Sequence, residues 1–220
     1  STELPPPPPP VDEPTTGGVA TQRPLRVMVV GDSVMLQIGD ALAQYAREHP
    51  DELVVFNHAR LGCPIARGGQ MRVHDGTEPN VHPHCAKWAE PAPVETLSSL
   101  EVYSFPSSLE AFQPDVVVSQ ATAWDVHDRR IPEHGFPEWT YVGDPAFDEY
   151  VASEYRAATD LLTSTGARMV WMLAAHQDRP LAPMTDPARI DRLNEILAAT
   201  MQDVPNVSIA DYPAWLGPVG

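Results

Sequence analysis

Short apolar runs alternate along the chain with longer stretches whose apolar residues recur at helical spacing. The runs are four to six residues long, which is typical of strands buried on both faces of a parallel sheet. They predict five strands, at residues 25–30, 53–57, 115–119, 168–173 and 207–210. Strands that alternate with helices in this way predict an α/β fold, a doubly wound parallel sheet with helices on both faces.

Helix start signals support this order of elements. Two Asp-Pro pairs combine a capping aspartate with a proline suited to a first helical turn, and they predict helices at 145–162 and 187–202. The connection from 62 to 113 differs, because it is rich in Pro, Gly and His and has no clear apolar period. We expect an insertion over the carboxyl edge of the sheet there, with one short helix near 94–102.

The tripeptide Gly31-Asp32-Ser33 lies where the apolar period changes from that of a strand to that of a helix. Such a turn aims a serine hydroxyl outward at the carboxyl edge of the sheet, where α/β proteins bind their ligands. It also places the hydroxyl beside the unpaired N–H groups of a helix start. Asp and Ser are ordinary N-caps and Gly is an ordinary turn residue, so the tripeptide alone fits either a cap or a nucleophile.

Charge and composition narrow the choice of partners. The 220 residues suffice for one domain and carry a formal net charge of −16, which argues against nucleic acid and anionic lipid surfaces as partners. A run of prolines at 5–10 predicts an extended polyproline II spacer. We therefore divide the chain into a proline-rich linker, 1–21, and a single α/β domain, 22–220.

Two cysteines, Cys63 and Cys85, lie in the irregular insertion. A free pair in a reducing compartment and a disulfide outside the cytoplasm are both open. We favour the disulfide, because the segment between the two cysteines has no apolar period that would order it. Nearby histidines, His74, His82 and His84, also raise the question of a zinc site. The spacing of adjacent His84 and Cys85 suits one tetrahedral ion poorly, so we expect no metal.

Short motifs follow each of the first three predicted strands: Gly31-Asp32-Ser33, Gly62 in Arg-Leu-Gly-Cys, and Thr-Ala-Trp-Asp at 122–125. Together they resemble sequence blocks of the SGNH (GDSL-like) hydrolases. The Gly-Cys and Trp-Asp pairs are similar to those of SGNH domains fused behind membrane acyltransferases, which decorate bacterial cell-envelope glycans and lipids. The resemblance implies a flavodoxin-like, five-stranded sheet of the SGNH hydrolase type, and catalysis without a cofactor.

The resemblance also implies roles for individual residues. Ser33 would attack an acyl donor, and the backbone N–H groups of Ser33 and Gly62 would hold the resulting oxyanion. Asp32 belongs to the first block, and Asp125 would order the loop around the nucleophile. The family usually places Asn before this second aspartate, whereas this chain has Trp124. An indole N–H can donate one hydrogen bond, but we expect the bulky ring to form a wall of an acyl pocket.

The family's general base and its orienting acid lie in an Asp-x-x-His block after the last strand, and no such block occurs in this sequence. We therefore expect the domain to be truncated at its C-terminus and to be weakly active or inactive. Two histidines follow strands at the correct edge and are candidate substitutes. His176, with Asp178 nearby, is the stronger candidate base and His127 the weaker, and either fits equally a polar loop residue or a substrate contact.

These inferences lead to the extracytoplasmic SGNH domain of an O-acyltransferase. It would transfer a short acyl group through acyl-Ser33 to a hydroxyl of a cell-envelope sugar or glycolipid. The expected partners are an acyl donor, the glycan or glycolipid acceptor, and a membrane acyltransferase domain of the same polypeptide that tethers the domain to the membrane.

The sequence leaves two alternatives open. A carbohydrate esterase is one, because water and a sugar hydroxyl compete for the same acyl-enzyme. The other is a non-catalytic module that binds the acceptor. In that module Trp124, Trp171 and Trp215 would stack on sugar or pack in the core, and we expect Trp171 in the core.

Overall fold

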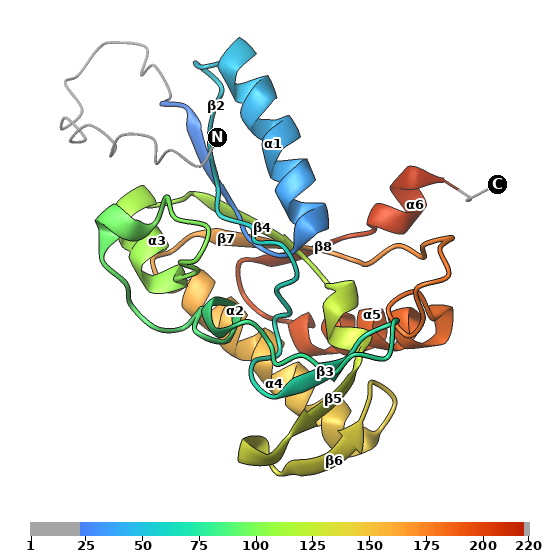
Figure 1. The fold of residues 1–220 in the computed structure, drawn as a ribbon. Helices are drawn as coiled ribbons and strands as arrows, with labels where there is room; N and C mark the ends of the chain where they lie inside the picture. The colour runs from blue at the N-terminus through green and yellow to red at the C-terminus, as the bar shows by residue number, and fades with distance from the viewer. Residues whose placement is uncertain (1–22, 218–220) are drawn as a thin grey trace, which may run out of the picture.

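The computed structural model describes residues 23–217, so the predicted linker at 1–21 lies outside the described residues. Its centre is a five-stranded parallel sheet in the order β2-β1-β4-β7-β8 (Figure 1). The strands are β1 (Leu25–Val29), β2 (Leu53–Asn57), β4 (Val116–Gln120), β7 (Arg168–Met172) and β8 (Val207–Ala210). All five predicted strands are confirmed, as is the doubly wound, flavodoxin-like arrangement, whose topological switch point lies between β1 and β4.

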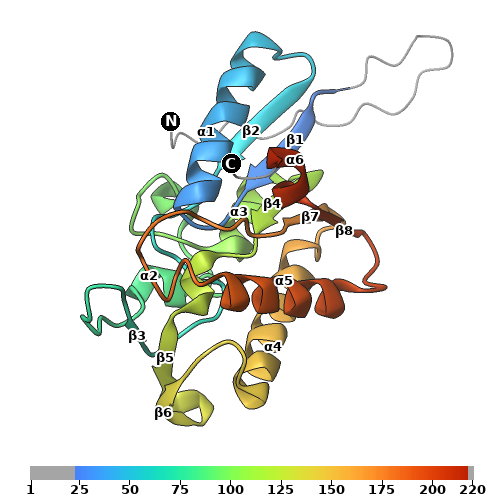
Figure 2. The same cartoon turned by 90° about the vertical axis from the view of Figure 1, so that its right-hand side faces the viewer.

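Helices cover the two faces of this sheet unequally (Figure 2). Helix α1 (Ser33–Glu48) packs on one face. Three helices pack on the other face: α3 (Phe105–Phe112), α4 (Pro145–Leu162) and α5 (Pro187–Met201). The helices predicted at 145–162 and 187–202 are confirmed. The three-helix face holds the larger core, in which Trp171 is fully buried as expected and donates its indole N–H to Thr159. On the α1 face, Val118 and Met172 stay half-buried.

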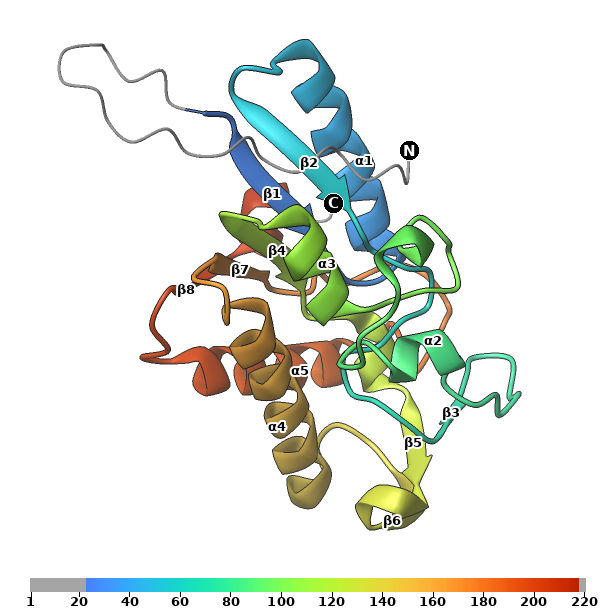
Figure 3. The same ribbon diagram turned by 90° about the vertical axis from the view of Figure 1, so that its left-hand side faces the viewer.

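A second, smaller sheet was not predicted. It is antiparallel, in the order β3-β5-β6, and lies at the end of the molecule away from α1 and β2 (Figure 3). Its strands are β3 (Gln70–Arg72), β5 (Asp128–Ile131) and β6 (Phe136–Thr140). Arg129 of β5 is fully buried and donates to the carbonyls of Ala66 and Gly68, so the small sheet is fastened to the loop after β2.

The insertion at 62–113 contains less helix near its middle than the sequence predicts. The short helix predicted near 94–102 is confirmed only in its first part, where a 3₁₀ helix, Val94–Thr96, forms. The guanidinium of Arg60 donates to the carbonyls of Leu97, Ser99 and Val102, which holds this segment against the loop after β2. Helix α3 begins at Phe105, where the Ser104 hydroxyl accepts the N–H of Ser107.

The remaining α-helices are the short α2 (Pro83–Ala86) and α6 (Tyr212–Leu216), and two further 3₁₀ helices span Ala123–Val126 and Pro132–His134. Helix α2 carries Cys85, which forms a disulfide with Cys63, so the predicted disulfide is confirmed. Within residues 23–217, no helix combines the length and the hydropathy that a membrane crossing requires.

Candidate functional site

Ser33 is the first residue of α1 and lies at the carboxyl end of β1, the place that the sequence predicted. It borders a cavity of about 440 Å³. Trp124, His176, Arg179 and Tyr212 line the same cavity, so it gathers residues from the loops after β4 and β7 and from α6. The N–H groups of a first helical turn have no intrahelical acceptors and can bind a ligand, although the N–H of Val34 already donates to Asp32.

Asp32 ties the Ser33 turn to the loop after β4. Its carboxylate is 2% exposed; one oxygen accepts the N–H of Val34 at 2.9 Å, and the other accepts the hydroxyl of Thr122 at 2.6 Å. Burial raises the pKa of Asp32, while the hydrogen bonds from Thr122 and the backbone oppose that shift. The aspartate therefore caps α1 and fixes the distance between the first and third sequence motifs.

Asp125 anchors the loop that follows β2. It is fully buried and accepts the N–H groups of Ile65 and Ala66 at 3.1 and 3.0 Å and the hydroxyl of Tyr155 at 2.8 Å. Arg129, also fully buried, lies 3.8 Å away. Burial raises the pKa of Asp125 to about 6, against the opposing influence of the nearby guanidinium. Asp125 therefore orders residues 65–66 of the loop after β2, and its role in ordering the loop around Ser33 stays a prediction.

Gly62 adopts a left-handed backbone conformation, with φ of +71°. A Cβ atom at this position would lie 3.7 Å from Cζ2 of Trp124, an ordinary contact, so the backbone conformation rather than crowding favours glycine. The Trp124 ring stacks on His127 and lines the cavity, as expected of a wall. Among the described residues, Gly62 itself is not part of the cavity lining. Its N–H as an oxyanion donor therefore stays a prediction.

The structure brings His176 to the cavity of Ser33 but pairs it with an unexpected aspartate. Its Nε2 lies 2.7 Å from Oδ1 of Asp191 on α5, not beside the nearby Asp178. The His176 side chain is 47% exposed. In residues 23–217 no hydrogen bond joins Ser33 to His176. The histidine thus lines the same cavity as the serine without a hydrogen bond to it.

His127, the weaker candidate base, is buried behind Trp124. It is 1% exposed, and its Nδ1 lies 3.2 Å from the carbonyl oxygen of Trp124. Burial lowers the pKa of His127 to about 4, so the ring is neutral at pH 7. It does not line the cavity, and this arrangement is that of a packing residue.

The zinc alternative weakens for a chemical reason. Ligand atoms of Cys63, His84 and Cys85 do lie within 4.8 Å of one another. Both sulfur atoms are joined in the disulfide, however, so neither is a thiolate, the form in which cysteine binds zinc.

Sequence reasoning missed three contributors to this edge of the sheet. Thr122, Tyr155 and Asp191 make the hydrogen bonds described above, yet each sits in an ordinary local pattern. Thr122 and Tyr155 also contact each other, because the N–H of Thr122 donates to the Tyr155 hydroxyl at 3.1 Å. The one sequence signal that could have pointed to any of the three residues is the position of Thr122 inside the third motif.

Comparisons with known proteins bear on the fold. No family model matches the chain, and no curated protein does. Solved structures do match. The chain is similar to a protein from Slackia heliotrinireducens named as an SGNH hydrolase, at 15% identity and a TM-score of 0.50, over 88% of this chain and 82% of that one.

Two further structures are similar over comparable lengths. A lipase/acylhydrolase from Enterococcus faecalis shares 15% identity, with a TM-score of 0.48, over 89% of this chain and 80% of that chain. Axe2, an acetylxylan esterase from Geobacillus stearothermophilus, shares 12% identity, with a TM-score of 0.47, over 88% and 78%. From the strand order and the Slackia structure, we conclude that the chain has the α/β fold of the SGNH hydrolases.

Proposed function

We propose that this protein is a serine acyl-transfer enzyme in which Ser33 carries the acyl group. The observation that carries the proposal is the placement of Ser33 on the first turn of α1, bordering a cavity, with its flanking Asp32 buried and doubly hydrogen-bonded. A volume of about 440 Å³ lies in the lower range of small-molecule sites, which suits a short acyl group and part of its carrier.

In the proposed reaction, the Oγ of Ser33 forms a bond to the acyl carbonyl carbon while its proton passes to a base. The N–H groups of Ser33 and Gly62 stabilise the oxyanion, and the bond to the donor's leaving oxygen then breaks. His176 is this chain's candidate base. Because its Nε2 faces Asp191, its Nδ1 is the nitrogen free to accept the proton. The base gives this proton to the donor's leaving oxygen. An acceptor hydroxyl then attacks the carbonyl carbon of acyl-Ser33 while its own proton passes to the base. The bond between that carbon and Oγ breaks, and the base returns the proton to Oγ.

The acceptor that we propose is a hydroxyl of a cell-envelope sugar or glycolipid. The disulfide supports a location outside the cytoplasm, since disulfides persist in oxidising compartments. The net charge of −16 favours an acceptor without strong negative charge. In this proposal the domain works at the extracytoplasmic face with a membrane acyltransferase domain of the same polypeptide, which delivers the acyl donor.

Hydrolysis of p-nitrophenyl acetate, combined with mass spectrometry of the quenched protein, tests the nucleophile. We expect Ser33→Ala to lower the rate by roughly three orders of magnitude or more and to abolish the acetylated species. Ser153→Ala is the matched control, because that serine is exposed on α4. A Ser33→Ala protein with an unchanged rate and an unchanged acetyl adduct would contradict the proposal.

The same assay separates the alternatives. Added sugar alcohols compete with water for acyl-Ser33. A transferase then forms the acetylated sugar alcohol as its product, whereas an esterase forms acetate. A non-catalytic module would instead bind glycan both as the unaltered protein and as Ser33→Ala, and neither protein would form an acyl adduct. Trp215, 79% exposed on α6 and stacked near Tyr212, is the ring that favours this last alternative.

A further inference from the structure

Gly31, two residues before Ser33, has both of its backbone polar atoms held by the segment that follows β2. Its N–H donates to the hydroxyl of Tyr103 at 2.9 Å, and its carbonyl accepts the N–H of Arg60 at 2.8 Å. The φ of Gly31 is +130°, a region open to glycine alone among common residues. The turn before the nucleophile therefore depends on external contacts for its conformation.

Tyr103 is built into the core of the insertion at 62–113. It is 2% exposed, and its ring packs against those of Phe105 and His58, with centroids 5.0 and 5.4 Å away. Burial raises the pKa of Tyr103, so the hydroxyl keeps its proton and offers its lone pairs to the Gly31 N–H. The phenol is thus a fixed acceptor rather than a mobile surface group.

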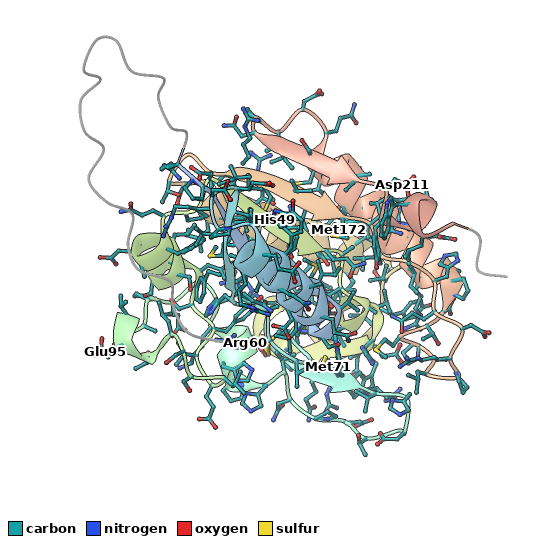
Figure 4. The ribbon with its side chains drawn as sticks, turned by 90° about the horizontal axis from the view of Figure 1, so that it is seen from above. His49, Arg60, Met71, Glu95, Met172 and Asp211 are labelled. Carbon is teal, nitrogen blue, oxygen red and sulfur yellow. A yellow bond between two sulfur atoms is a disulfide. The ribbon has the colours of Figure 1, made fainter. Side chains whose placement is uncertain are left out.

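Arg60 joins the loop of Gly62 to the segment that carries Tyr103. Its guanidinium is buried and donates to the carbonyls of Leu97, Ser99 and Val102 at 3.0 to 3.2 Å. Seen from above, Arg60 and Met172 lie on opposite sides of α1 (Figure 4), so this contact approaches the turn from the β2 side. The backbone and the side chain of one residue therefore connect Gly31 to the insertion.

We propose that the insertion braces the nucleophile turn, with Tyr103 as a positioning residue for Ser33. The inference rests on the proposed acyl-transfer function. Fixing the Gly31 N–H sets the direction of the next peptide groups, and so the places of the Ser33 N–H and Oγ relative to a bound acyl group. A displacement of about 1 Å at a reacting atom can lower the rate about a hundredfold. Contacts that hold the turn in place can therefore have a large effect on the rate.

Tyr103→Phe removes the hydroxyl and keeps the ring that packs against Phe105. The matched control is Tyr45→Phe, which removes an exposed hydroxyl bonded to Glu52 at the far end of α1. Both variants are compared with the unaltered protein in p-nitrophenyl acetate hydrolysis and in amide hydrogen exchange at Gly31 by NMR.

For Tyr103→Phe we expect kcat to fall about tenfold to a hundredfold with KM changed less than about twofold. Exchange of the Gly31 amide should accelerate about tenfold or more. Tyr45→Phe should change neither. An unchanged kcat, or an unchanged Gly31 exchange rate, in Tyr103→Phe would overturn the brace while leaving Ser33 as the nucleophile. An unchanged rate in Ser33→Ala overturns the acyl-transfer proposal itself, and with it the positioning role.

Discussion

The two halves of the candidate site are built differently. The half around Ser33 is held by buried groups: Asp32 is 2% exposed, Asp125 is fully buried, and both accept hydrogen bonds from other loops. The half around His176 lies at the surface, where the histidine is 47% exposed and its partner Asp191 61% exposed. One half is fixed by the core, whereas the histidine of the other half is held by a solvent-exposed hydrogen bond to Asp191.

The difference separates two tasks of an acyl-transfer site. Stabilising an oxyanion requires donors that are already oriented, because reorienting them during the reaction costs free energy. Moving a proton tolerates a side chain that swings into place on substrate binding. The buried half is suited to the first task, and the exposed half is suited to the second only once a substrate orders it. Substitutions in the two halves test this contrast through the free energy of unfolding.

Asp125→Ala should have the largest effect, because it removes the buried anchor and leaves the Arg129 charge unpaired in the core. We expect the free energy of unfolding to fall by about 3–5 kcal/mol in urea titrations at pH 7. Asp160→Ala, which removes an exposed partner of Arg156, is the matched control and should cost less than about 0.5 kcal/mol. Equal losses in the two variants would contradict a firmly built Ser33 half.

Acid should destabilise the buried half through His127. The unfolded chain binds a proton on this ring below its ordinary pKa of 6.5, whereas burial lowers the pKa of the folded ring to about 4. Stability from the neutral ring is therefore present above pH 6.5 and lost as the pH falls toward 4, by about 3 kcal/mol at most.

His127→Phe keeps a ring against Trp124 and cannot take up a proton. Urea unfolding at pH 7, 5 and 4 should therefore show a smaller loss of stability on acidification for His127→Phe than for the unaltered protein. Parallel pH profiles for the two proteins would show that the ring does not titrate differently on folding. Asp125, whose raised pKa acts in the opposite direction, is present in both proteins and cancels in the comparison.

Changes at the exposed half should barely alter stability. His176→Ala and Asp191→Asn should each cost less than about 1 kcal/mol of unfolding free energy, because contacts between solvent-exposed polar side chains contribute little. Their effect on hydrolysis is expected to be larger: about a hundredfold for the histidine as a general base, and less for its partner. Asp191→Asn should lower kcat more than Asp178→Asn does, and the reverse order would contradict the observed pairing.

Much of the fold was readable from local patterns. The strands of the large sheet are short apolar runs, and α4 and α5 begin at Asp-Pro pairs, so both are encoded within a few residues. The small sheet lacks such a signal. Strand β5 reads Asp-Arg-Arg-Ile, and its pairing with Gln70–Arg72 joins residues far apart in the chain. Pairing partners, not the apolar period, decide such a strand.

The candidate site divides along the same line. The sequence by itself determined that Ser33 lies at the end of β1 and that Cys63 and Cys85 share the insertion, because caps and spacings are local. Only the tertiary structure decided the side-chain partners at the site. The Tyr103 hydroxyl accepts the N–H of Gly31, and His176 pairs with Asp191 instead of Asp178. These contacts join residues 15 to 72 positions apart, and their hydrogen bonds exist only after the sheet and its helices have brought the loops together.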